Sequence, residues 1–183
     1  MPQNPWETLS SSYVYQNKWF SVREDQVIRP DGEPGTYSVV EAERLAIGII
    51  PLWEDGTITL VGQFRYPLDE YSWEIPAGGG QFDVESVEGA KRELLEETGI
   101  TANTWQYLGR LHTSNCFNDE VSHLYMATEL TQGTAMPDPD EILTSRRVPF
   151  EEAIAMIRNG SITDAISVAG IFHVMLKMYT RQT

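Results

Sequence analysis

Apolar and polar positions alternate in short runs through the N-terminal part of the chain, which is the pattern of half-buried β-strands. Residues 13–28 alternate well enough for one or two strands, and a turn cluster, DGEPG at 31–35, follows them. The alternation resumes in TYSVVEA at 36–42, which predicts a further strand. This part of the chain is therefore expected to consist of strands that short turns connect.

A continuous apolar run, LAIGIIPLW at 45–53, predicts a strand that is buried on both faces. The turn residues EDG at 54–56 lead into TITLVGQFRY at 57–66, which is a second strand pattern. Two strands joined by so short a turn are expected to form a hairpin. The glycine-rich sequence PAGGG at 76–80 is expected to be a loop.

The spacing of apolar residues changes to that of a helix at 86–98. Three of these residues recur at i, i+3 and i+7 and predict a face that packs on a sheet: Val87, Ala90 and Leu94. Ser86 is expected to cap the N-terminus of this helix, and Gly99 is placed to end it in a left-handed conformation.

The remaining pattern predicts strands at 104–111 and 121–130 and helices near 149–158 and 163–180. The polar, proline-containing segment 131–141 is expected to be a loop. Its acidic residues are interpreted as solvated: Asp138, Asp140 and Glu141. Strands that alternate with helices indicate an α/β fold.

Composition limits the classes of function. The 183 residues suffice for one domain with a substantial core, and 41% of them are hydrophobic, as in ordinary globular proteins. The net charge of −14 argues against nonspecific binding to nucleic acid or to an anionic membrane surface. Cys116 is the single cysteine, so no intrachain disulfide is expected and the cytoplasm is the simplest location. The sequence contains no recognisable signal peptide and no apolar stretch near the roughly 20 residues of a membrane span.

Much negative charge is concentrated in the predicted helix, in GAKRELLEETGI at 89–100. Glu93 precedes Glu96 by three residues and Glu97 by four, so a helix places the three carboxylates on one side, where they repel one another. Such a cluster is usually a solvated acidic face. Here only two basic residues lie nearby and a glycine-rich loop precedes the helix, which favours a metal site. A hard divalent cation such as Mg²⁺ prefers oxygen ligands and binds together with substrate phosphates.

Residues 78–100 resemble the Nudix box, a glycine, five residues, a glutamate, seven residues and REUXEEXGU, in which U is aliphatic. The matching positions are Gly78, Arg92, Glu93, Leu94, Glu96, Glu97, Gly99 and Ile100. One position departs, because Val84 stands at the place of the first glutamate and Glu85 follows one residue late. The resemblance implies a Nudix-like α/β/α sandwich with a mixed sheet over residues 41–183, after an N-terminal β-strand extension at 1–40.

Sequences that flank the box are similar to the ADP-ribose and nucleotide-sugar pyrophosphatase branch of the Nudix family: GQFRYP at 62–67, WEIPAG at 73–78 and TSNCFNDE at 113–120. The resemblance implies hydrolysis of the pyrophosphate bond of a nucleoside diphosphate sugar such as ADP-ribose, to a nucleoside monophosphate and a sugar phosphate. Asn115 occupies the place of a proline that ADP-ribose enzymes often carry. The resemblance therefore indicates the branch and leaves the base and the sugar open.

The same resemblance implies functions for individual residues. The implied ligands of Mg²⁺, with Mn²⁺ as an alternative, are the Ala77 carbonyl and the side chains of Glu93, Glu96 and Glu97. The expected substrate-binding residues are Arg65, Arg44, Glu74, Gly78 and Gly79. The expected catalytic residues are Glu120, Glu96 and Arg92. Arg65 or Arg44 is expected to hold the phosphates, since a guanidinium matches their geometry in a forked contact.

The general base remains open among three carboxylates. A carboxylate that binds a cation has a lowered pKa and is a weaker base. This favours Glu120, at the end of the loop 113–120, and the resemblance assigns catalysis to a glutamate at this place. Asp119 is the neighbouring alternative, and Glu96 is the alternative within the box.

Two other functions remain as alternatives. One is a Nudix pyrophosphatase for another nucleoside diphosphate derivative, such as a dinucleoside polyphosphate or coenzyme A. The other is a noncatalytic nucleotide-sugar sensor, which the retained carboxylates disfavour. The branch is commonly dimeric and aromatic residues are enriched at interfaces, so we expect a homodimer with the strands around Trp19 at its interface. Packing in a core is the alternative role of Trp19, and neither nucleic acid nor a membrane is expected as a partner.

Overall fold

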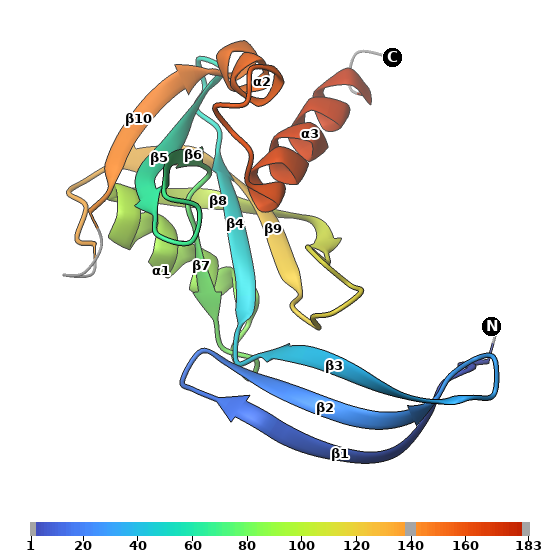
Figure 1. Cartoon of the computed structure of the whole chain (residues 1–183). Coiled ribbons are helices and arrows are strands. Elements are labelled where there is room, and N and C mark those ends of the chain that lie inside the picture. The colour runs from blue at the N-terminus through green and yellow to red at the C-terminus, as the bar shows by residue number, and fades with distance from the viewer. Residues whose placement is uncertain (1–2, 138–141, 181–183) are drawn as a thin grey trace. The chain divides into compact units, whose positions relative to one another are not determined.

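The computed structural model describes residues 3–137 and 142–180 (Figure 1). Three residues of the expected acidic loop lie outside the described residues: Asp138, Asp140 and Glu141. The backbone forms two compact units. The N-terminal unit contains the residues up to Arg44 and Ser114–Glu120, and the second unit contains Leu45–Thr113 and the residues from Val121 onward.

The N-terminal unit contains an antiparallel sheet in the order β1-β2-β3, formed by Glu7–Gln16, Phe20–Ile28 and Pro34–Ala42. The strands predicted within 13–28 are confirmed, although β1 begins earlier and is exposed along its whole length. Asn17 makes the turn between β1 and β2, because its Oδ1 accepts hydrogen bonds from the N–H groups of Trp19 (2.7 Å) and Phe20 (2.9 Å). The Trp19 side chain is 65% exposed, so the alternative of core packing is wrong.

The second unit contains a mixed sheet in the order β7-β4-β9-β8, formed by Ala77–Gly80, Leu45–Pro51, Ser122–Gln132 and Ile100–Leu111. β4 lies parallel to β9 and antiparallel to β7, so the expected mixed sheet is confirmed. All residues of β4 after the first two are buried, as its continuous apolar run predicts.

A separate antiparallel sheet has the order β10-β5-β6 and is formed by Thr144–Pro149, Thr57–Arg65 and Glu70–Glu74. The predicted hairpin between β4 and β5 is wrong. The turn itself forms, since the Trp53 N–H donates to the Thr57 carbonyl at 2.9 Å, but beyond an isolated bridge between Leu52 and Ile58 the strands enter different sheets. They separate because β7 and β9 occupy the two edges of β4.

The prediction of a loop at 76–80 is also wrong. Ala77–Gly80 is strand β7, and its backbone pairs with Leu45–Gly48. A strand contains glycine where another group approaches closely, and a Cβ on Gly80 would lie 2.6 Å from Ile47 Cδ1. The sequence patterns also failed to predict the short strands β6 and β10.

The predicted helices are confirmed in three segments, α1 at Ser86–Thr98, α2 at Phe150–Arg158 and α3 at Ala165–Thr180. Among the described residues, no helix is long and apolar enough to cross a membrane.

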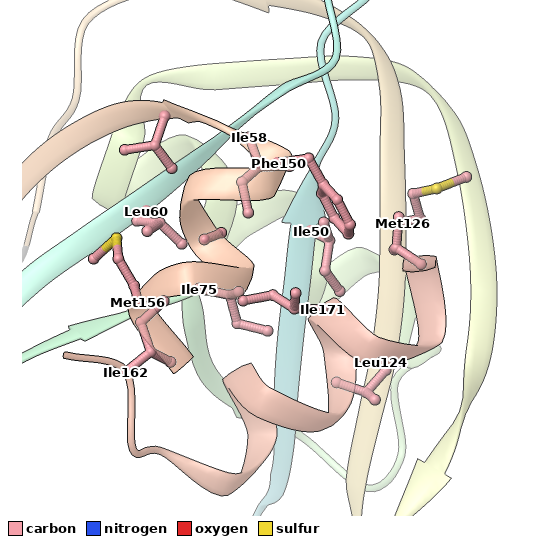
Figure 2. Close-up of a cluster of buried hydrophobic side chains, with 13 residues drawn as sticks. Ile50, Ile58, Leu60, Ile75, Leu124, Met126, Phe150, Met156, Ile162 and Ile171 are labelled. Atoms are coloured by element: carbon pink, nitrogen blue, oxygen red, sulfur yellow. The ribbon is translucent and has the colours of Figure 1, made fainter. Parts of the chain in front are cut away.

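The apolar side chains of β4 alternate between two cores, one on each face of the mixed sheet. Ile47 and Ile49 pack with Leu94 of α1, whereas Ile50 packs with Ile171 of α3 (Figure 2). Helix α1 therefore covers one face of the sheet and α3 covers the other. The α/β/α sandwich with a mixed sheet that the sequence predicted is confirmed.

Candidate active site

Helix α1 carries the acidic cluster, and contacts at its N-terminal end fix it against β9 of the mixed sheet. The prediction that Ser86 caps the helix is wrong, because Ser86 is its first residue and makes no capping bond. The Ser86 hydroxyl instead forms hydrogen bonds with the Tyr125 hydroxyl (2.6 Å) and with His123 Nδ1 (2.8 Å), both on β9. Gly99 ends the helix as predicted, with φ 71° and its N–H donating to the Leu95 carbonyl at 2.8 Å.

Glu97 is the most deeply placed carboxylate of the cluster, since only 5% of the residue is exposed. Its Oε2 accepts a hydrogen bond from the Ala77 N–H at 3.1 Å. This bond joins α1 to β7 and brings together two of the residues that the sequence assigned to the metal. A buried carboxylate needs such polar partners, because burial of a charge without them is costly.

Glu93 lies against the glycines of β7. A Cβ on Gly78 would lie 2.1 Å from Glu93 Cδ, so only glycine leaves room for this carboxylate. Arg92 donates hydrogen bonds to Glu93 Oε1 (2.6 Å), to Glu96 Oε2 (2.8 Å) and to the Gly79 carbonyl (2.8 Å). Arg92 therefore compensates part of the negative charge, because it bridges two of the three carboxylates.

These residues fit a divalent cation by the chemistry of their donors. Carboxylate oxygens from Glu93, Glu96 and Glu97 and a backbone carbonyl at Ala77 are the hard ligands that Mg²⁺ and Mn²⁺ prefer. Within the described ranges, no group of three or more His, Cys, Asp or Glu side chains already stands in an arrangement that holds a metal ion. The guanidinium of Arg92 supplies positive charge to the cluster instead.

We expect Gly78→Ala to lower kcat by about 100-fold, the size of effect expected when a reacting or binding group moves by about 1 Å. The added methyl group collides with the Glu93 carboxylate and forces it to move. The measurement is steady-state hydrolysis of a nucleotide sugar, with circular dichroism to verify the fold. Gly35→Ala is the matched control, because its methyl group meets only the flexible Arg29 side chain, at 3.0 Å from Cδ. A normal kcat in Gly78→Ala contradicts the assignment of Glu93 to the site.

A second group of predicted residues forms a pocket of about 240 Å³ beside the β5–β6 sheet. Arg65 Nε donates to Glu74 Oε1 at 2.8 Å, and a second bond joins Arg65 Nη2 to Glu74 Oε2. Glu74 is buried, and its hydrogen bond with Arg65 raises the pKa of the arginine. Ser72, Thr163 and Asp164 contribute polar groups to the same pocket. Asp164 was not predicted from the sequence, although an aspartate directly before an apolar helix is a capping signal.

The remaining predicted residues, Arg44 and Glu120, belong to the N-terminal unit, so their places in the site stay predictions. Within that unit, Asp119 has a structural contact, because its Oδ1 accepts a hydrogen bond from the Ala42 N–H at 2.9 Å.

Comparison with known proteins identifies the family. The model described as the NUDIX domain matches residues 42–166, which is most of the chain. This chain belongs to the Nudix family. A second model, described as the nucleoside diphosphate sugar hydrolase N-terminal domain, matches residues 6–40 of this Nudix protein. The resemblance found in the sequence is therefore confirmed.

Two curated relatives cover nearly the whole Nudix protein. An ADP-ribose pyrophosphatase of Mycobacterium tuberculosis is 35% identical over 179 residues, which cover 95% of this chain and 85% of the relative. An ADP-ribose pyrophosphatase of Bacillus subtilis is 30% identical over 173 residues, which cover 93% of each chain. A crystal structure of an ADP compounds hydrolase superposes with a TM-score of 0.88 over 99% of this chain and 98% of that one. Its sequence is 20% identical, so this likeness supports the fold alone.

Proposed function

We propose that this Nudix protein hydrolyses the pyrophosphate bond of a nucleoside diphosphate sugar similar to ADP-ribose, giving a nucleoside monophosphate and a sugar phosphate. The observation that carries the proposal is the pair of relatives named ADP-ribose pyrophosphatase, which align with more than nine tenths of this chain. The nucleoside diphosphate sugar hydrolase model at residues 6–40 supports the same class of substrate. The packing of Ala77, Gly78 and three carboxylates around α1 is consistent with it.

Nudix hydrolases generally depend on a divalent metal ion. We propose Mg²⁺, with Mn²⁺ as the alternative, and Ala77, Glu93, Glu96 and Glu97 as the residues that hold it. When bound, such an ion neutralises the phosphate oxygens and lowers the pKa of a coordinated water. Arg92 has a positioning role, because it donates one hydrogen bond to Glu93 and one to Glu96 and so holds both carboxylates in place.

The other residues are proposed to bind the substrate and to remove a proton from the attacking water. Arg65 lines the pocket and is held there by Glu74, and a guanidinium suits the geometry of a phosphate. Arg44 is proposed as a further phosphate contact from the N-terminal unit. Glu120 is proposed to remove the proton from the attacking water, and Asp119 and Glu96 remain the alternative bases. Gly79 contributes its backbone, whose carbonyl accepts a hydrogen bond from Arg92.

The experiment that tests this function is a substrate panel. The protein is incubated with Mg²⁺ and with nucleotide sugars, dinucleoside polyphosphates or coenzyme A, and the products are identified by mass. Preferred conversion of a nucleotide sugar to a nucleoside monophosphate and a sugar phosphate supports the proposal. Preferred cleavage of another member of the panel identifies a different Nudix pyrophosphatase. Binding of ADP-ribose without any product indicates a sensor.

We also propose a homodimer. The exposed strand β1 supports it, since apolar side chains along β1 and its turn are open to partners: Leu9, Val14 and Trp19 are 57%, 60% and 65% exposed. Light scattering at micromolar concentration is expected to give twice the chain mass of 20.7 kDa. Trp19→Asp is expected to shift this distribution toward the monomer. A single species of 20.7 kDa for the wild type contradicts the proposal.

Two further proposals concern organisation and location. We propose a domain boundary between residues 40 and 41, because one family model ends at residue 40 and the other begins at residue 42. The single cysteine, Cys116, remains the reason to propose a cytoplasmic location.

A further inference from the structure

The connection between β6 and β7 passes from the β10-β5-β6 sheet to the mixed sheet, and it leads directly to Ala77, the first residue of β7. Ile75 in this connection is completely buried (Figure 2). Its backbone N–H lies outside both strand ladders and donates instead to Ser167 Oγ of α3 at 2.9 Å. A buried N–H without a partner is costly, so Ser167 satisfies a group that the sheets leave open.

Ser167 is itself completely buried, and Asp164 fixes the direction of its hydroxyl. Ser167 Oγ donates to Asp164 Oδ2 at 2.7 Å, and the Ser167 N–H donates to the same oxygen at 2.8 Å. Since this hydroxyl proton points to Asp164, a lone pair is left to accept the bond from Ile75. Asp164 also lines the pocket that contains Arg65.

Three successive residues of the connection are thus held by three different elements. The Ile75 N–H is held by α3, the Pro76 carbonyl accepts from the Ile49 N–H of β4 at 2.9 Å, and the Ala77 N–H donates to Glu97 of α1 at 3.1 Å. Each attachment therefore restrains the backbone that leads to Ala77.

The packing around this attachment leaves little room for adjustment. A Cβ on Gly48 would lie 2.6 Å from Ile166 Cγ2 and 2.9 Å from Ile75 Cδ1, and a Cβ on Gly170 would lie 2.8 Å from Ile50 Cδ1. Two glycines allow α3 to lie directly on β4 and on the Ile75 side chain. A change at the start of α3 is therefore transmitted to the connection, because close-packed interiors deform little.

We propose that Ser167 and Asp164 are positioning residues for the hydrolysis: they hold the Ile75–Ala77 backbone in the conformation that presents the Ala77 carbonyl to the metal. Neither residue touches the reacting atoms in this proposal. The proposal rests on the proposed function for its kinetic consequences, and its structural part is measurable without turnover.

The test compares Ser167→Ala with the wild type in the full-length protein. Ser167→Ala is expected to lower kcat and to weaken Mn²⁺ binding by about 10–100-fold, the range for groups that orient metal ligands. KM for the nucleotide sugar is expected to change little. Mn²⁺ affinity is measured by electron paramagnetic resonance without substrate, and hydrogen exchange of the Ile75 amide is measured by NMR. This exchange is expected to accelerate relative to neighbouring core amides.

Val174→Ala is the control for a general loss of stability, because Val174 is a buried α3 residue of the same core and makes no contact with the connection through a hydrogen bond. It is expected to lower the melting temperature while kcat and Mn²⁺ affinity stay near those of the wild type. Equal kinetic effects in Val174→Ala and Ser167→Ala overturn the proposal, and so does an unchanged Mn²⁺ affinity in Ser167→Ala.

Asp164 supplies a second pair of variants in case Ser167→Ala does not fold. Asp164→Ala removes the acceptor of the Ser167 hydroxyl and is expected to weaken Mn²⁺ binding and to accelerate Ile75 exchange, as in Ser167→Ala. Asp164→Asn retains an acceptor oxygen and is expected to keep the Mn²⁺ affinity and the Ile75 exchange of the wild type. If Asp164→Asn is as impaired as Asp164→Ala, the charge of Asp164 matters rather than the hydrogen bonds, and the proposal is wrong. If the wild type hydrolyses no member of the panel, the proposed function is wrong. Mn²⁺ affinity and Ile75 amide exchange, compared between the variants and the wild type, still test whether Ser167 and Asp164 position the backbone.

Discussion

Glu97→Gln is expected to reduce turnover by more than about 100-fold. Loss of a residue that only orients a metal ligand already costs about 10–100-fold, and Glu97 is itself a proposed ligand. The substitution retains the size of the side chain and an oxygen that accepts from the Ala77 N–H, but it removes the negative charge. In the metal-free protein the melting temperature is expected to hold or to rise, since one of several like charges on α1 is lost. Turnover at several Mg²⁺ concentrations and thermal unfolding in chelator measure the two effects.

Glu93→Gln is expected to give the same loss of turnover, as its carboxylate belongs to the same cluster. Glu88→Gln serves as the control on this helix, because Glu88 is exposed and pairs with Lys91 at 2.6 Å rather than with Arg92 or β7 backbone groups. It is expected to retain the activity of the wild type. If Glu93→Gln or Glu97→Gln retains full activity at low Mg²⁺, that residue is not a ligand.

Glu120→Gln is expected to lower kcat by roughly 10²–10⁴-fold, the usual effect of losing a general base. Affinities for substrate and Mg²⁺ are expected to change little, because the residue acts on a proton rather than on the metal. The acidic limb of the pH–rate profile, which reports protonation of the base, is expected to flatten.

Asp119→Asn and Glu96→Gln distinguish Glu120 from its alternatives. Asp119→Asn is expected to remain active, since an asparagine oxygen also accepts from the Ala42 N–H. A normal kcat in Glu120→Gln together with a large loss in Glu96→Gln places the base on α1. A large loss in Asp119→Asn alone places it in the loop one residue earlier.

The parts of the fold that were predictable from the sequence are those that local periodicity determines. Val87, Ala90 and Leu94 recur at helical spacing, and Ala90 and Leu94 are completely buried in the structure. The apolar run 45–53 correctly predicted a buried strand, because β4 contributes side chains to a core on each face of the sheet. Gly99 ended its helix because a left-handed residue without Cβ is favourable there.

The predictions that failed concern segments whose structural partners are distant in the sequence. Residues 76–80 contain turn-forming glycines, yet they form a strand because β4 offers an edge to pair with. The turn at 54–56 forms as expected, but the strands on either side pair elsewhere. Ser86 satisfies the local rule for a cap, but Tyr125 and His123 compete for its hydroxyl.

For the candidate site, residue types and spacing predicted which side chains cluster, but not the contacts within the cluster. A helical spacing of three and four places Glu93, Glu96 and Glu97 together without revealing that Glu97 is buried. The bridge from Arg92 to two carboxylates is a rotamer choice that spacing does not determine. Ser167 was missed because its partner Ile75 is 92 residues away.

The parallel pairing of β4 with β9 has a consequence for synthesis of the chain. The strand Leu45–Pro51 leaves the ribosome well before residues 122–127, with which it pairs. Until then, one edge of this apolar strand exposes unpaired N–H and C=O groups, which is a template for association with other chains. A chain interrupted before Val121 contains the whole Nudix box and β7 but lacks β9, the parallel partner of β4. Such fragments are expected to aggregate or to require a chaperone.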